Sequence, residues 1–514
     1  KGALFDDMDM KKQVQNHIRW SRYGDRNEIS LQEAQMRTFN NFIWRFAQTE
    51  GNYNFSSGSR GKGNLSSEAN PYFLFPQIYN FRYNIFSSEW PVANRVIELY
   101  LQKKSENGGW ERQINGISNN EKAVLLLEKR TFKELLVDME LRNLQNNIVG
   151  QEASRLFARA EINMGVEAFR DSLYSLLKRN TFLNIKFENM LDTLGEISRT
   201  DIRSLLGEWE KTTPLPFYSL GEPTLTKITN KGGEEFFVLK MLISNNSDYD
   251  GIIHMDIRKD GWWYQPLEDP RAKTKIEMPA HTSKEFVSVW EDQIRNVEIN
   301  TMVSGNLPNI ISQDINNVKQ ERNKIVKDSI YILPESSFDL PGEIIVDNED
   351  STLFILSAPP IVGLLPKWLD EVEETPFKYS GISWWRPPLQ WTATTNDRYY
   401  GKYIRSAFVI KSGDGSQTAT WKVPVPEVGQ YDLYYHVFKD DELRWNNNLQ
   451  GEYHFKVKYG SEVEDAYVNL RKANEGWEQL GSYYFDSDTV RVVLTDECKL
   501  RSVTADAVKI VKRY

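Results

Sequence analysis

The chain has 514 residues, enough for about three domains that each bury a core of their own. Its 40% hydrophobic and 26% charged residues are typical of a globular protein. The formal net charge of −9, with no basic block of five or more residues, argues against a nucleic-acid binder, which needs a basic face. No apolar run is long enough to cross a bilayer, so the sequence predicts no transmembrane segment.

Cys498 is the only cysteine, which excludes an intramolecular disulfide. This usage fits a reduced cytoplasm or a bacterial extracytoplasmic protein that folds without disulfides. The sequence begins at Lys1 without an initiator methionine or the apolar stretch of a signal peptide. We therefore expect a processed or truncated chain.

Residues 1–88 form a mixed N-terminal segment. Residues 31–47 carry apolar side chains at helical spacing, and residues 51–70 are rich in glycine, serine and asparagine. We expect a helix in the first stretch and a mobile surface loop in the second.

Helical signals dominate residues 89–213. Pro91 suits a first helical turn, and Thr131 with Glu134 has the spacing of a capping box. Further helices are predicted over about 150–161, 165–179, 183–194 and 200–210. These elements predict an array-like helical domain.

At Pro214 the apolar period changes from helical spacing to alternation. Residues 214–312 predict a small antiparallel β-sandwich with strands over 236–244, 251–258, 274–278, 284–289 and 297–303. Residues 313–340 are interpreted as a charged linker, and residues 341–514 as a second β-sandwich. The predicted fold class is multidomain α+β: a helical N-terminal region followed by two antiparallel β-sandwich domains.

The C-terminal region resembles the golvesin-type, xanthan-lyase-like β-sandwich domain. The matching segments occur in order along the whole region: 345–348, 421–426, 429–431, 465–468, 477–485, 492–496 and 505–508. Such domains are similar to carbohydrate-binding modules and are appended to secreted or surface enzymes. The resemblance thus implies an extracytoplasmic location, in the periplasm or at the cell surface.

Residues of about 90–310 resemble the C-terminal helical and β regions of gluzincin, thermolysin-like zinc aminopeptidases. The resemblance is carried by Phe187, Leu191, residues 197–202, 205–206, Trp209, residues 215–217, 279–285 and 297–301. That family binds zinc through a His-Glu-x-x-His helix. The five histidines here are His17, His254, His281, His436 and His454, and no two are four residues apart. The family's zinc site therefore cannot be assembled from this chain, and we predict no catalytic residue, no metal site and no cofactor.

Aromatic residues near the start of the C-terminal region are the best candidates for ligand binding, because flat sugar faces stack on aromatic rings. The predicted set is Trp384, Trp385, Trp391, Tyr399, Tyr400 and Trp445. The alternative is that these rings fill the sandwich core or face another domain, which is the usual place of large aromatic side chains.

The sequence favours a non-catalytic binding or assembly protein that attaches to a glycan or to an envelope protein through residues 341–514. One alternative is the C-terminal portion of a zinc aminopeptidase whose His-Glu-x-x-His half is absent from this chain. Another is a structural subunit of a cell-envelope complex.

Overall fold

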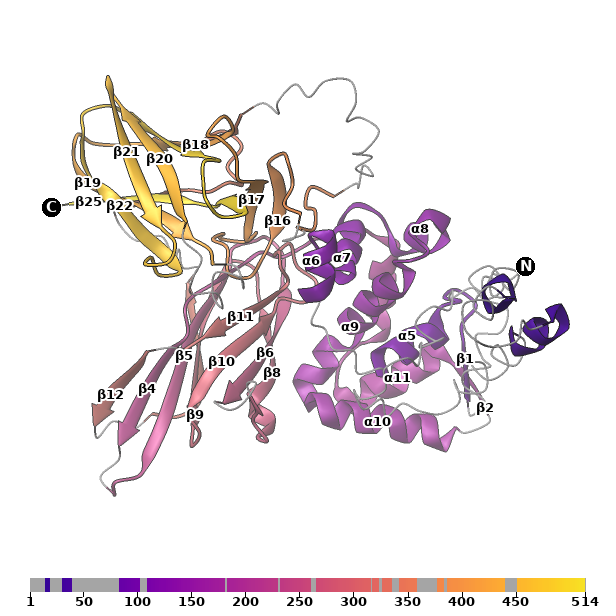
Figure 1. Ribbon diagram of the computed structural model, residues 1–514. Helices are drawn as coiled ribbons and strands as arrows, with labels where there is room; N and C mark the ends of the chain where they lie inside the picture. Colours follow the sequence, from indigo (N-terminus) through magenta and orange to yellow (C-terminus); the bar gives the residue numbers. More distant parts are fainter. Residues whose placement is uncertain are drawn as a thin grey trace. The chain divides into compact units, whose positions relative to one another are not determined.

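The computed structural model describes residues 14–18, 30–38, 83–101, 109–180, 183–229, 232–259, 265–315, 317–322, 326–334, 342–357, 377–382, 386–439 and 451–513. The chain divides into two compact units: residues 1–106 with 123–214, and residues 107–122 with 215–514 (Figure 1). A helical N-terminal region precedes sandwich-like antiparallel sheets, which confirms the predicted α+β multidomain class. The predicted loop over 51–70 lies outside the described residues; of the predicted helix over 31–47, residues 31–38 are described and helical.

The first unit is built on helices that enclose one apolar core. The helices are α5 (Ala93–Leu101), α7 (Asn119–Lys129, whose first turn belongs to the second unit), α8 (Phe132–Val137), η2 (Met139–Leu141), α9 (Gln145–Met164), α10 (Val166–Arg179), α11 (Phe187–Ser198) and η3 (Arg203–Glu210). Strands β1 (Tyr83–Phe86) and β2 (Leu183–Lys186) pair in parallel. The helix predicted to begin at 183 therefore begins only at Phe187, because Leu183 to Lys186 extend to pair with β1.

The predicted capping box at the start of α8 is present. The Thr131 hydroxyl accepts from the Glu134 amide, and the Glu134 carboxylate accepts from the Thr131 amide at 2.8 Å. Two backbone donors that a helix start leaves unpaired are thereby satisfied.

An aromatic cluster closes the core of the first unit. Trp209 meets Trp90 edge-on with ring centroids 5.0 Å apart, and Phe132 at 4.8 Å. Trp209 is 1% exposed, so its whole ring fills space that no neighbouring side chain can occupy.

Replacing Trp209 with alanine should lower the free energy of unfolding of the helical unit by about 3–5 kcal/mol, because it leaves a cavity among rings that cannot collapse. Urea unfolding followed by far-ultraviolet circular dichroism measures the loss. Val137→Ala, at a side chain that is 71% exposed, is the control and should change stability by less than about 0.5 kcal/mol. Equal effects of the two variants would contradict the packing argument.

The second unit begins its β structure with two facing sheets. One contains β6 (Gly251–Lys259), β7 (Gln265–Pro266), β8 (Lys273–Met278), β10 (Ile294–Asn300) and β11 (Ile310–Asp314). The other contains β3 (Tyr218–Leu220), β4 (Thr224–Thr229), β5 (Glu235–Asn245), β9 (Thr282–Trp290), β12 (Val318–Arg322) and β13 (Ser329–Pro334). Side chains from both sheets share one buried cluster, which makes this region a sandwich.

The prediction of a charged linker over 313–340 is wrong for two stretches. β12 pairs in parallel with β4, and β13 pairs antiparallel with β9, so both belong to the middle sandwich. They are terminal strands of their sheet, where one long edge faces solvent and charged side chains such as Lys319 and Glu321 are tolerated. The charged side chains of β12 hid its strand pattern, whereas β13 has no charged residue and its apolar run was overlooked within the segment interpreted as a linker.

Within the second unit, the segment 107–122, which includes α6 (Gly109–Asn115), packs against both β regions. The buried Glu121 carboxylate accepts from the Asn309 amide at 2.9 Å and from Arg112 Nε at 3.0 Å. Gly381 lies against the backbone of Ile114, and a Cβ there would stand 1.9 Å from the Ile114 carbonyl oxygen. Only glycine allows this approach.

The C-terminal sandwich consists of three sheets. The first orders β14 (Glu343–Val346), β25 (Val508–Lys512), β19 (Gly429–Val437) and β22 (Gly476–Phe485). The second orders β15 (Phe354–Leu356), β18 (Thr418–Pro424), β23 (Thr489–Thr495), β20 (Glu452–Tyr459) and β21 (Glu462–Asn469). A short third sheet joins β16 (Thr392–Thr395), β17 (Ser406–Lys411) and β24 (Ser502–Ala505).

The core of this sandwich lies between the first and second sheets. Trp421 of β18 and Tyr435 of β19 are both fully buried there, with ring centroids 6.3 Å apart. The outer faces of the two sheets consequently point away from each other. In the part of the chain that is described, no helix is long and apolar enough to cross a membrane.

Candidate functional site

The outer face of the first sheet of the C-terminal sandwich is the candidate binding site. Along β19, Tyr431, Leu433 and Tyr435 are buried in the core. Tyr434 and His436 alternate with them and are only partly buried, so they point outward. On the neighbouring strands, the partly buried Trp477 and Lys509 lie on the same outer face.

Strand pairing determines which outward side chains are neighbours. His436 pairs with Trp477 of β22, and Tyr434 lies between Gln479 of β22 and Lys509 of β25. A β-bulge at Leu480 adds one residue to β22. On both sides of the bulge, outward-facing residues of β22 therefore stay opposite outward-facing residues of β19.

Four aromatic side chains gather on this surface, and we call Tyr400, Tyr434, His436 and Trp477 the aromatic face. The rings of Tyr400 and Trp477 have centroids 5.1 Å apart, and each lies near the His436 ring, at 5.8 and 5.1 Å. Lys509 Nζ stands 4.8 Å from the Trp477 ring and 5.3 Å from the Tyr434 ring, and it pairs with Glu343 at 3.0 Å. The cation therefore borders the rings while its charge is balanced.

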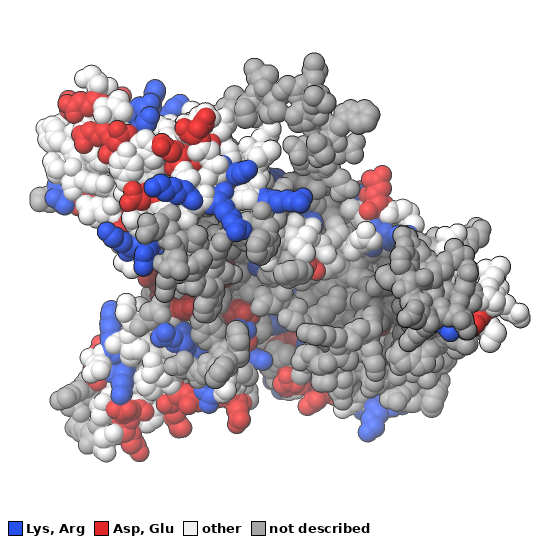
Figure 2. Space-filling view, viewed as in Figure 1, with Lys and Arg blue, Asp and Glu red and all other residues white. Residues whose placement is uncertain are grey.

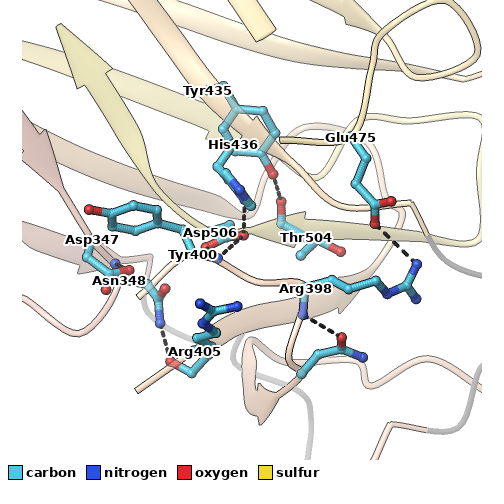
Figure 3. Close-up of polar contacts among 12 residues, drawn as sticks. Asp347, Asn348, Arg398, Tyr400, Arg405, Tyr435, His436, Glu475, Thr504 and Asp506 are labelled. Atoms are coloured by element: carbon cyan, nitrogen blue, oxygen red, sulfur yellow. Dashed lines mark hydrogen bonds and ion pairs between the residues drawn. The ribbon is translucent and has the colours of Figure 1, made fainter. Parts of the chain in front are cut away.

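A buried carboxylate beneath the surface orients the two central members of the aromatic face (Figure 3). Asp506 is 0% exposed; its Oδ2 lies 2.8 Å from His436 Nδ1, and it accepts from the Tyr400 amide at 3.1 Å. We assign the proton to Nδ1, because a carboxylate oxygen accepts there; with the proton on Nδ1, Nε2 of the imidazole is the acceptor nitrogen. Burial raises the pKa of Asp506, whereas its contact with His436 acts in the opposite direction.

Further polar groups surround Asp506. Burial, and next the charge of Asp506, raise the pKa of Asp347 well above its usual value. Arg398 lies on the loop that carries Tyr400. Its guanidinium donates to the Lys439 carbonyl at 2.9 Å and pairs with Glu475 at 3.1 Å. Figure 3 shows these groups from several strands converging on the loop that carries Tyr400.

The predicted ligand-binding residues have different locations. Tyr400 lies on the aromatic face, whereas Tyr399 is 3% exposed and packs on Phe438 with ring centroids 4.6 Å apart. Trp391 is partly buried against the sandwich core. Trp384, Trp385 and Trp445 lie outside the described residues.

Sequence reasoning missed Tyr434, His436 and Trp477 as site residues. A signal was present: in the alternating stretch from Tyr431 to Val437, Tyr434 and His436 occupy the positions between the apolar ones. Their meeting with Trp477 depends on strand pairing with a bulge, which the sequence does not show.

Among the described residues, no group of three or more histidine, cysteine, aspartate or glutamate side chains could hold a metal ion. Burial raises the pKa of Cys498, which keeps that thiol protonated and a poor nucleophile.

The fold and this surface define a C-terminal β-sandwich with one aromatic outer face. The family model of the golvesin C-terminal domain matches residues 387–512, so the predicted golvesin-type domain is confirmed. The resemblance to gluzincin aminopeptidases is not shown and stays a prediction. No curated protein matches the chain.

Several solved structures are weakly similar. A Bacteroides uniformis β-glucuronidase is 11% identical, with a TM-score of 0.18, and the match covers 62% of this chain and 32% of the enzyme. The chain thus spans about a third of the length of that enzyme. The structure of TmCBM61 in complex with β-1,4-galactotriose is 13% identical, with a TM-score of 0.13, and the match covers 34% of this chain and 86% of that one. At such TM-scores these likenesses carry no argument about function.

Asp347→Asn should stabilise the C-terminal sandwich at pH 7.5. The raised pKa means that folding disfavours the ionised carboxyl, so wild-type stability falls as pH rises from the unfolded value, about 3.9, through the native value. The amide oxygen of asparagine can still accept from the Asn348 amide, now at 2.7 Å from Asp347 Oδ1. Urea midpoints from pH 4 to 7.5 should show a gain that vanishes toward pH 4.

Asp414→Asn is the matched control with the opposite sign. The Ser416 hydroxyl and amide lower the pKa of Asp414, so its ionised form favours folding at neutral pH. This variant should be no more stable than the wild type at pH 7.5. A loss of stability in Asp347→Asn at that pH would contradict the argument from burial.

Proposed function

We propose that this chain is a non-catalytic extracytoplasmic protein that attaches to a neutral glycan through the aromatic face. The observation that carries the proposal is the cluster of partly exposed Tyr400, His436 and Trp477 rings on an otherwise flat sheet. The golvesin-type domain and its resemblance to carbohydrate-binding modules support the same conclusion and the extracytoplasmic location.

The chemistry of the aromatic face suits a sugar. A pyranose presents a flat C–H face that packs on an aromatic ring, and its hydroxyls need polar partners at the edge of the ring. Trp477 and Tyr400 supply rings, whereas Gln479, which donates to Asp432 at 3.0 Å, lies at the polar border.

His436 can orient the bound sugar through a hydrogen bond. Asp506 holds Nδ1, so Nε2 can accept a hydrogen bond from a sugar hydroxyl. Because the carboxylate is buried and receives two partners, the imidazole is oriented before a ligand arrives, which reduces the entropy lost on binding.

Trp477→Ala should weaken binding of the preferred neutral oligosaccharide at least tenfold, or about 1.4 kcal/mol, by removing a stacking surface. An array of galacto-, gluco-, manno- and xylo-oligosaccharides identifies the ligand, and isothermal titration calorimetry measures the affinity. Tyr467→Ala, at a 59% exposed ring on the other sheet, should change affinity less than twofold. Unchanged binding by Trp477→Ala together with Tyr400→Ala would exclude the aromatic face as the site.

A second candidate is self-assembly through β13, which supports the structural alternative. Consecutive side chains from Ile330 to Leu333 are exposed, with Ile332 at 72%, and β13 is the last described strand of its sheet. Such an edge can pair with the same strand of a second copy.

Ile332→Lys should convert a dimer into a monomer, because a buried lysine would oppose pairing of two apolar edges. Light scattering after size-exclusion chromatography measures the mass. Val463→Lys, at a 59% exposed valine of the C-terminal sandwich, is the control and should leave it unchanged. A wild-type chain that is monomeric at about 100 µM excludes this candidate, since an interface of useful affinity would be occupied there.

A further inference from the structure

The opposite face of the C-terminal sandwich carries a straight row of positive charge. Arg491 of β23 pairs directly with Lys422 of β18 on one side and with Lys458 of β20 on the other. All three alternate with buried core residues, so they share the outer face of the second sheet. We call Lys422, Arg491 and Lys458 the cationic row.

No carboxylate balances these charges within the described part of the chain: none of the three takes part in an ion pair there. The acidic side chains of the neighbouring strand β21 have other partners. Asp465 lies 2.7 Å from His454 Nε2, and the Glu464 carboxylate accepts from the Tyr459 hydroxyl.

The cationic row destabilises the folded sheet, so its presence needs an explanation other than folding stability. Like charges directly opposite each other in a sheet are destabilising. The sequence has 72 acidic residues against 63 basic ones. Acidic and basic side chains could therefore alternate across these strands without a change in overall composition. On the face shown in Figure 2, basic and acidic side chains are intermingled.

We propose that the cationic row binds a linear polyuronate, a glycan with a carboxylate on successive sugars. Adjacent strands are about 4.8 Å apart, so the three cations span about 10 Å in a line. The separation of about 4.8 Å between adjacent strands is on the scale of one pyranose, so carboxylates on successive sugars can each lie near one strand. The central arginine can hold a carboxylate by two parallel hydrogen bonds, and the lysines contribute point charges.

The immediate surroundings favour a glycan over a nucleic acid. Single-stranded nucleic acids are held by aromatic rings interleaved with cations, whereas the adjacent row of this sheet holds Thr420, Val493 and Lys456, none of which is aromatic. The net charge of −9 also disfavours long-range attraction of a phosphate backbone. This proposal is independent of the aromatic face, which lies on the other sheet.

The test compares Lys422→Gln/Arg491→Gln/Lys458→Gln with the full wild-type chain. Binding of oligogalacturonate, measured by isothermal titration calorimetry at pH 7, should fall at least tenfold. Raising NaCl from about 0.05 M to about 0.5 M should weaken wild-type binding, since salt screens exposed charges. Carboxyl-reduced oligogalacturonate, the same chain without charge, should not respond to the triple substitution.

Two variants keep the result interpretable. Lys411→Gln/Arg471→Gln/Lys472→Gln removes the same charge from exposed positions of the same domain and should change affinity less than twofold. Lys422→Arg/Lys458→Arg keeps the charge and should retain binding. The row variant should remain folded, with an unchanged or higher melting temperature, because it removes repulsion.

Three outcomes would overturn the proposal. The first is absence of oligogalacturonate binding by the wild type. The second is equal loss of binding in the row variant and the control variant. The third is binding of a single-stranded DNA oligonucleotide or a sulfated glycan as tight as that of oligogalacturonate, which would make the row a general polyanion surface. Loss of neutral-glycan binding by Trp477→Ala alone would concern only the aromatic face.

Discussion

The buried carboxylate of Asp506 is the interaction on which the C-terminal domain depends. It lies between β24 and β25, and its side chain accepts from the Tyr400 amide and holds the His436 imidazole. Its own carbonyl accepts from the indole of Trp421 at 3.2 Å, so the same residue connects the core to the surface. A carboxyl group at 0% exposure is unfavourable unless its oxygens have hydrogen-bond partners, which explains why the loop and the imidazole are fixed around it.

A sandwich of two sheets gives this domain two outer faces that can differ in chemistry. Alternation sends every second side chain into the shared core, and the remaining ones are free of packing constraints. On one sheet they are aromatic rings with a balanced lysine; on the other they include three unbalanced cations in register. The two surfaces are separated by the core, so substitutions on one should not act on the other.

The sequence allowed the fold to be predicted wherever burial imposes a period. The strands over 236–244, 251–258, 274–278 and 284–289 are present as parts of β5, β6, β8 and β9 because each has a buried face. The terminal strand β12 was missed because an edge strand tolerates charge, and β13, which has no charged residue, was missed because its short apolar run follows a charged stretch. The site was less predictable: neighbours in sequence, Tyr399 and Tyr400, point to the core and to the surface, whereas Tyr400 and Trp477 meet only through pairing of distant strands.

Buried acids with raised pKa values occur in both units, since burial also raises the pKa of Glu152 in the helical unit. In the helical unit the buried Glu161 accepts from the Tyr100 hydroxyl at 2.7 Å, and the buried Glu98 pairs with Arg95 at 2.7 Å. The Arg95–Glu98 pair is local, whereas the Tyr100–Glu161 hydrogen bond joins α5 to α9. The C-terminal domain instead combines a raised-pKa carboxyl beside a second buried acid with a row of like charges. Packing alone gives no reason for the row of like charges, whereas the ligand binding proposed above for this outer face would give it a role.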